Sequence, residues 1–405
     1  MATMRKLSDP VQLPSGVVFR NRLVKAAMAE HMTKTHTPTD EIPVAYKNWG
    51  KGGWGGILTG NVQLDDRWLG GKNDLTFTNS SNPDVQARWR QYADACRVEG
   101  TPAIVQVCHP GRQSPMRAGS RGLLEKNIAP SAVPLKLGEN LASRVVQKVV
   151  FGTPREMTVE EINDLVKRFA DAAKFLSEMG VDGIELHAAH GYLLSLFMSP
   201  RLNHRADAYG GSPTNRVRII TEIIHAIRAI VPATFAVGIK LNSADVQHSN
   251  DTAEAIEQIH LIIAAGIDFL EISGGTYEDP RMTGRAESQV VDKPVSSRTA
   301  NREAYFLDFA HTVRKQFPGV VLMVTGGFRS LAGMEAALAE NACDVIGVAR
   351  PAAVDPAWAR ILLAAEKEGR EEVLRLNKVH PGWLMSKIPV RAIGAGAEWL
   401  EPPAP

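Results

Sequence analysis

The amino-acid sequence predicts a single (β/α)8 barrel spanning residues 1–405. Eight short apolar segments alternate with amphipathic helical segments along the chain, and eight strand–helix units are the number that closes a barrel. The two longest connections both follow predicted strands, so they fall on the face where barrel enzymes build their active sites. An open doubly wound sheet is the main alternative, but it usually needs fewer strands.

The predicted strands are short, rich in Val, Ile and Leu, and bounded by Gly or Pro, as buried parallel strands are. They are Arg22–Met28, Gly56–Gly60, Ala103–Cys108, Gly183–His187, Ala236–Leu241, Phe269–Ser273, Val320–Thr325 and Val345–Ala349.

Helix ends are marked by capping residues. Thr158 and Glu161 form a capping box that opens a helix, which we expect to stop at Gly180. Asn82-Pro83, Ser212-Pro213 and Asp355-Pro356 each place a cap residue before a proline suited to the first helical turn.

Three segments depart from the regular strand–helix repeat. Residues 109–157 contain turn residues but no convincing helix, and a loop of that length usually forms a lid or a small subdomain. Gly274–Ala300 is a second long excursion, and residues from about 370 to 405 form a C-terminal extension. Within it, the apolar stretch Trp383–Trp399 is a candidate surface for packing on a neighbouring chain.

Composition argues against several kinds of binding partner and cofactor. A formal net charge of +2 gives no electrostatic reason to expect nucleic acid or an anionic membrane. We expect no signal peptide in the first 13 residues and no membrane span. The three cysteines lie far apart, which suits a reducing cytoplasm and excludes a four-cysteine iron–sulfur site within these 405 residues.

Candidate catalytic residues follow the fourth strand. His187 and His190 are three residues apart, so one helical turn would place both imidazoles on the same side. Two N–H donors there could hold one carbonyl oxygen and stabilise the negative charge it gains during reduction. Tyr192 keeps its proton at neutral pH and could donate it. These residues alone leave catalysis and a structural role open, whereas a metal site lacks a third ligand.

Polar residues also interrupt other barrel strands. Gln106 offers a donor and an acceptor within an apolar strand, and Lys240 would be costly to bury unless paired or functional. The seventh and eighth strands end in Gly326-Gly327 and Ala349-Arg350. Barrels commonly bind phosphate there through glycine N–H groups and a helix N-terminus.

The run from His187 to Ser212 resembles the signature of the old yellow enzyme family, H-x-x-H-G-Y-L, then S-P, then N-x-R-x-D-x-Y-G-G-S. The similarity extends from Asn21 to Pro356. It implies a flavoprotein that uses NADPH or NADH to reduce activated C=C bonds of α,β-unsaturated carbonyl or nitro compounds by ping-pong hydride transfer. Relatives of this kind are often homodimers or homotetramers.

The resemblance also implies roles for individual residues. His187 and His190 would hold the substrate oxygen, and Tyr192 would supply the proton. The residues expected to bind FMN are Ala27, Met28, Ala29, Gly60, Gln106, Lys240, Gly326, Gly327, Ala349 and Arg350. Ala29 is a departure, because many relatives have Thr or Cys beside the flavin and alanine cannot donate that hydrogen bond.

Three alternative functions are compatible with parts of the sequence. A larger dienoyl-CoA reductase or amine dehydrogenase would carry an iron–sulfur cluster, for which this chain lacks the cysteines. A barrel lyase or aldolase could use the phosphate site for its substrate. A non-catalytic flavin-binding protein would bind FMN without turnover.

Overall fold

The computed structural model describes residues 5–122, 124–138, 140–243, 249–274, 307–373, 377–378 and 400–401. The predicted excursion Gly274–Ala300 and the apolar stretch Trp383–Trp399 lie outside these residues, apart from Gly274 itself. No helix in this part of the chain is long and apolar enough to cross a lipid bilayer.

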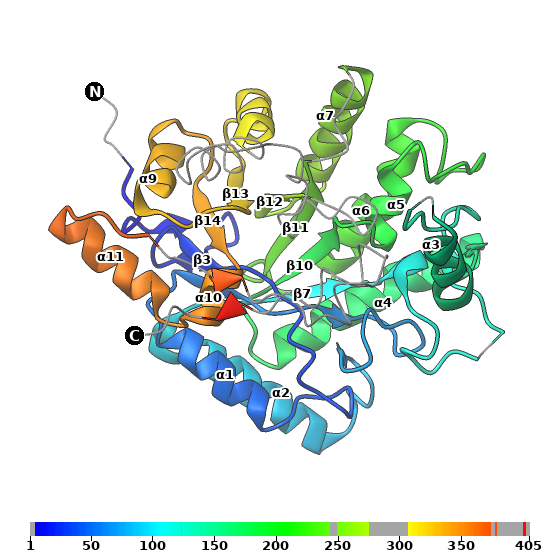
Figure 1. The fold of residues 1–405 in the computed structure, drawn as a ribbon, viewed down its shortest axis with the longest axis horizontal. Helices are drawn as coiled ribbons and strands as arrows, with labels where there is room; N and C mark the ends of the chain where they lie inside the picture. The colour runs from blue at the N-terminus through cyan, green and yellow to red at the C-terminus, as the bar shows by residue number, and fades with distance from the viewer. Residues whose placement is uncertain are drawn as a thin grey trace.

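Eight parallel strands form a closed ring at the centre of the molecule, with helices around it (Figure 1). The ring closes where β7 pairs with β10, so the predicted barrel is confirmed. Every predicted strand has a counterpart in the ring. The strands are β3 (Leu23–Lys25), β4 (Gly56–Leu58), β7 (Ala103–Cys108), β10 (Gly183–Ala188), β11 (Ala236–Asn242), β12 (Phe269–Ser273), β13 (Val321–Thr325) and β14 (Val345–Val348).

Apolar side chains fill the amino-terminal half of the barrel interior. A hairpin that the sequence did not predict, β1 (Val11–Gln12) and β2 (Val18–Phe19), contributes to the same cluster as the inward-facing strand residues. Phe19 meets Phe269 edge to face, with ring centroids 6.1 Å apart. Gly238 leaves room for the Phe269 ring, since a Cβ there would lie 2.1 Å from it. The interior is therefore filled at this end, and a ligand site has to lie at the carboxyl ends of the strands.

The outer helices begin largely where the sequence predicts. Thr158 forms the capping box of α4 (Val159–Glu178), while Asn82 and Ser212 cap α2 (Pro83–Cys96) and α6 (Pro213–Arg228). The others are α1 (Glu41–Gly50), α5 (Leu193–Met198), α7 (Ser249–Ala264), α9 (Leu331–Ala339), α10 (Arg350–Val354) and α11 (Trp358–Glu368).

The prediction that Asp355 caps a helix starting at Pro356 is wrong. Helix α11 begins at Trp358, and its N-cap residue is Ala357. Asp355 instead follows α10, where its side chain accepts a hydrogen bond from Ala357 N at 2.8 Å. Such an Asx turn satisfies the backbone locally and delays the start of the next helix.

The connection over residues 109–157 contains structure that the sequence did not reveal. It holds α3 (Leu141–Val146), which continues as a π-helical turn (Gln147–Phe151), and a parallel strand pair, β8 (Ile128–Ala129) and β9 (Arg155–Glu156). The expectation of no helix was therefore wrong. Helix α3 is only six residues long and exposes Leu141 and Val145, so it lacks the apolar periodicity by which helices are recognised.

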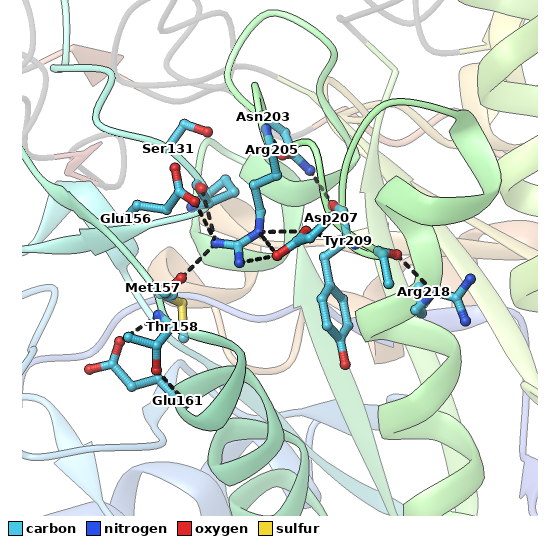
Figure 2. A network of polar contacts seen from close by, with 12 residues as sticks. Ser131, Glu156, Met157, Thr158, Glu161, Asn203, Arg205, Asp207, Tyr209 and Arg218 are labelled. Atoms are coloured by element: carbon cyan, nitrogen blue, oxygen red, sulfur yellow. Dashed lines mark hydrogen bonds and ion pairs between the residues drawn. The ribbon is translucent and has the colours of Figure 1, made fainter.

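Arg205 ties the base of this connection to the loop that precedes α6 (Figure 2). Its buried guanidinium donates to Met157 O at 2.6 Å and to Pro130 O at 3.3 Å. It also forms an ion pair with Asp207. Asn203 donates to the carbonyls of Phe197 and Tyr209, and so holds the loop itself. The second part of the signature motif, N-x-R-x-D-x-Y-G-G-S, therefore has a structural role.

We predict that Arg205→Met lowers the free energy of unfolding by about 3–5 kcal/mol, because buried carbonyls and Asp207 lose their donor. Urea denaturation measures the change. Arg218→Met is the matched control, because Arg218 donates to Ala208 O at the exposed edge of the same network and should cost less than about 1 kcal/mol. Equal losses in the two variants would contradict the anchoring role of Arg205.

Candidate active site

The barrel brings most of the candidate residues to the carboxyl ends of its strands. His187 is the second-last residue of β10, Lys240 lies near the end of β11, and strand register places them directly side by side. Gln106 lies on β7, which pairs with β10 on its other edge. The glycine pair follows β13, and Ala349 and Arg350 follow β14.

The two histidines meet, but not through a helical turn as predicted. His187 belongs to a strand, whereas His190 has φ 60° and Gly191 has φ 76°. This left-handed turn reverses the chain before α5 begins at Leu193. The His187 ring centroid lies 4.9 Å from that of His190 and 4.6 Å from that of Tyr192. A non-glycine residue in this conformation is strained, and such strain is typical of functional turns.

Neighbouring loops hold the strained turn in place. Gln113 Nε2 donates to His190 O at 2.9 Å, and His190 N donates to Asn242 Oδ1 at 3.3 Å. Asn61, which lies three residues after the end of β4, has its Nδ2 3.5 Å from the Tyr192 hydroxyl. The sequence analysis did not single out Asn61, and only its place after a strand end could have suggested it.

Both histidines are neutral at physiological pH. Burial lowers the pKa of His187 well below its usual value, and the nearby His190 and Lys240 lower it further. Burial and Lys240 lower the pKa of His190 to about 3. His187 Nδ1 accepts a hydrogen bond from Ala189 N at 3.2 Å, so its proton is on Nε2. His187 can therefore offer an N–H donor without a positive charge.

A layer of polar side chains crosses the barrel interior beside His187. Gln106 Nε2 donates to Glu185 Oε2 at 2.6 Å, and Lys240 Nζ donates to Glu271 Oε1 at 2.6 Å. Both contacts follow from strand register, in which Gln106 faces Glu185 and Lys240 faces Glu271. Neither glutamate was predicted from the sequence as a site residue. A charged residue within an apolar strand could have indicated them. Glu185 lies two residues before His187, so both side chains point to the same face of the strand.

The two glutamates differ in protonation. Burial raises the pKa of Glu185 well above its usual value, and the neighbouring Glu271 raises it further. Burial also opposes ionisation of Glu271, but the charge of Lys240 and a hydrogen bond from Glu185 lower its pKa overall. Protonation therefore favours Glu185 over Glu271, which pairs with Lys240.

The backbone comes close to other chain segments or turns sharply at the strand ends around this layer. Gly60 packs so closely that a Cβ would lie 2.1 Å from Met28 O. Ala27 and Met28 are half-buried, and Ala29 is exposed. Gly326 and Gly327 have φ values of 144° and 82°, which leave backbone N–H groups free to turn toward a ligand.

The donor set fits a ligand with a polar ring at one end and a phosphate at the other. Ala349 is the N-cap residue of α10 and Arg350 is its first residue, so a helix start and a guanidinium lie beside the glycine turn. Gln106 and Lys240 lie inside the barrel as buried nitrogen donors. In the described ranges, no three His, Cys, Asp or Glu side chains are grouped to hold a metal ion.

Residues 6–368 match the model of the NADH:flavin oxidoreductase / NADH oxidase family. The chain belongs to this family. It is therefore an oxidoreductase of the old yellow enzyme type, as the motif from His187 to Ser212 indicated.

Relatives with a related description occur in fungi. The NADH-dependent flavin oxidoreductase iccE of Talaromyces variabilis is 47% identical, covering 86% of this chain and 84% of its own length. The NADH-dependent flavin oxidoreductase iliE of Neonectria sp. (strain DH2) is 43% identical over 95% of this chain. The matched part spans 51% of that relative, or about half its length.

Solved structures share the fold at lower sequence identity. Morphinone reductase superposes with a TM-score of 0.70, at 21% identity, covering 94% of this chain and 93% of its own. At this identity the similarity supports the barrel architecture alone.

We predict that neither His187 nor His190 becomes protonated between about pH 8 and pH 5, where an unperturbed imidazole would gain its charge. A pKa below this window leaves the neutral form populated throughout it. Imidazole nitrogen chemical shifts from NMR measure this directly. His31 is an internal comparison, because a hydrogen bond to Asp74 raises its pKa and it should titrate. Titration of His190 alongside His31 would contradict the assignment.

Proposed function

We propose that this protein is an FMN-dependent ene-reductase that reduces activated C=C bonds with a nicotinamide as electron donor. The observation that carries the proposal is that the strained turn at His190 brings His187, His190 and Tyr192 together beside the Gln106 and Lys240 layer. The overall reaction adds a hydride and a proton to the alkene and oxidises NAD(P)H to NAD(P)+.

Bound FMN would supply the two-electron hydride chemistry of a ping-pong cycle between the nicotinamide and the alkene. Lys240 and Gln106 would hold the flavin ring, because they are the donors that face the barrel interior. Gln106 turns its amide nitrogen toward Glu185, so its carbonyl oxygen is the group that faces away from that contact. Gly326, Gly327, Ala349 and Arg350 would hold the phosphate, with Ala27, Met28, Ala29 and Gly60 lining the ring.

His187 and His190 would hold the carbonyl or nitro oxygen of the substrate. As neutral imidazoles they act as hydrogen-bond donors and gain strength as negative charge develops on that oxygen. The Tyr192 hydroxyl would then donate its proton to the α-carbon, and the contact with Asn61 Nδ2 orients that hydroxyl.

We propose NADH as the preferred donor, because the Talaromyces and Neonectria relatives are both described as NADH-dependent. The proposed substrates are α,β-unsaturated carbonyl or nitro compounds. A cytoplasmic location and a homodimer or homotetramer belong to the same proposal. The free, buried cysteines Cys96, Cys108 and Cys343 support a reducing compartment. Membership of an oxidoreductase family removes the lyase or aldolase alternative, and turnover distinguishes the enzyme from a flavin-binding protein.

We predict that Tyr192→Phe separates the two half-reactions. Reduction of the FMN-loaded enzyme by NADH needs no proton from the protein and should stay within about twofold of the native rate. Reoxidation by cyclohexenone should slow by about 100-fold, the usual scale for losing a general acid. Stopped-flow absorbance of the flavin band measures both steps.

Tyr209→Phe is the matched control, because its hydroxyl bonds Glu222 on α6 and lies outside the site. It should leave both half-reactions unchanged. Equal slowing of the two half-reactions in Tyr192→Phe would mean that Tyr192 positions the reactants and that another group supplies the proton.

A further inference from the structure

Two buried glutamates take no direct part in the reaction proposed above. Glu185 on β10 and Glu271 on β12 are both fully buried inside the barrel. They come from alternate strands, which is how side chains of one interior layer meet in a barrel. Each has one nitrogen donor, Gln106 for Glu185 and Lys240 for Glu271, and each contact is 2.6 Å long.

The second carboxyl oxygen of each glutamate indicates that one of the two groups is protonated. Glu185 Oε1 and Glu271 Oε2 are buried, and no N–H group within the described ranges reaches either of them. Both side chains belong to the same interior layer of the barrel. After burial, the charge of Glu271 and a hydrogen bond to it raise the pKa of Glu185 further. Two carboxylates are both acceptors, so this contact requires that one of them be protonated.

The charges of the layer then sum to zero. Lys240 carries one positive charge, Glu271 one negative charge, and Glu185 and Gln106 are neutral. A buried ammonium without a counter-ion is costly, so the layer needs one negative charge beside Lys240. Loss of either glutamate would leave the other to ionise beside Lys240.

We infer that Glu185 and Glu271 share a single proton and act together as the counter-ion of Lys240, either carboxyl group being able to carry the negative charge. Both are positioning residues that act through Lys240. The inference rests on the proposed function in one respect, namely that Lys240 faces the flavin. If Lys240 faces the flavin, Glu185 and Glu271 determine the net charge of the protein groups beside the reduced, anionic cofactor.

Infrared spectroscopy of the purified holoenzyme at neutral pH tests the shared proton. The native protein should show the C=O stretching band of a buried carboxylic acid. Glu185→Gln and Glu271→Gln should each abolish the band, because the remaining glutamate ionises against Lys240. Lys240→Met should increase the band about twofold, because both glutamates are then protonated. Glu178→Gln, at the exposed end of α4, is the control that leaves the band unchanged.

A band that persists in Glu271→Gln would overturn the inference, because Glu185 would then be an acid through burial alone. Absence of the band from the native protein would overturn it as well. Since both single variants make the same prediction, either one that folds is sufficient. The readout does not depend on turnover, so failure of the ene-reductase proposal would leave this test intact.

The midpoint potential of bound FMN tests the link to the cofactor. Each single variant should change the two-electron reduction equilibrium by less than tenfold, which corresponds to about 30 mV. The double variant Glu185→Gln/Glu271→Gln leaves Lys240 without a counter-ion and should raise the potential by more than that amount. A double variant with the native potential would overturn the proposed action on the flavin.

Discussion

The parallel pairing of β7 with β10 closes the barrel, and the register of that ring decides where each polar side chain of the interior lies. Register sets Gln106 against Glu185 and Lys240 against Glu271, and it sets His187 beside Lys240. A slip of one residue in any of these pairings would turn the whole inward set toward the helices. The hairpin and the ring of Phe269 fill the amino-terminal end, so the polar residues are confined to the other half of the barrel.

Because the polar residues are confined to one half of the barrel, the charge of Lys240 affects the pKa values of His187 and His190. Lys240 is buried beside His187, and together with burial its charge keeps both imidazoles neutral. The same lysine forms an ion pair with Glu271, with Nζ and Oε1 2.6 Å apart. One ion pair inside the barrel therefore influences the groups proposed to bind the cofactor and those proposed to bind the substrate.

The sequence was sufficient to predict the barrel, its eight strands and most helix starts, because these depend on local patterns of apolar and capping residues. The left-handed turn at His190 could not be predicted, since a spacing of three residues suits a helical turn equally well. Helix α3 and the Arg205 contacts depend on packing between distant segments. Glu185 and Glu271 were overlooked because their partners lie on neighbouring strands, and only strand register shows that they meet.

The most direct test of the account is an anaerobic titration of the purified protein followed by visible absorption. The protein should contain one FMN per chain, NADH should bleach the oxidised flavin band, and cyclohexenone should then restore it with formation of cyclohexanone. A protein that cannot be loaded with FMN, or a reduced flavin that the enone does not reoxidise, would contradict the assignment as an ene-reductase.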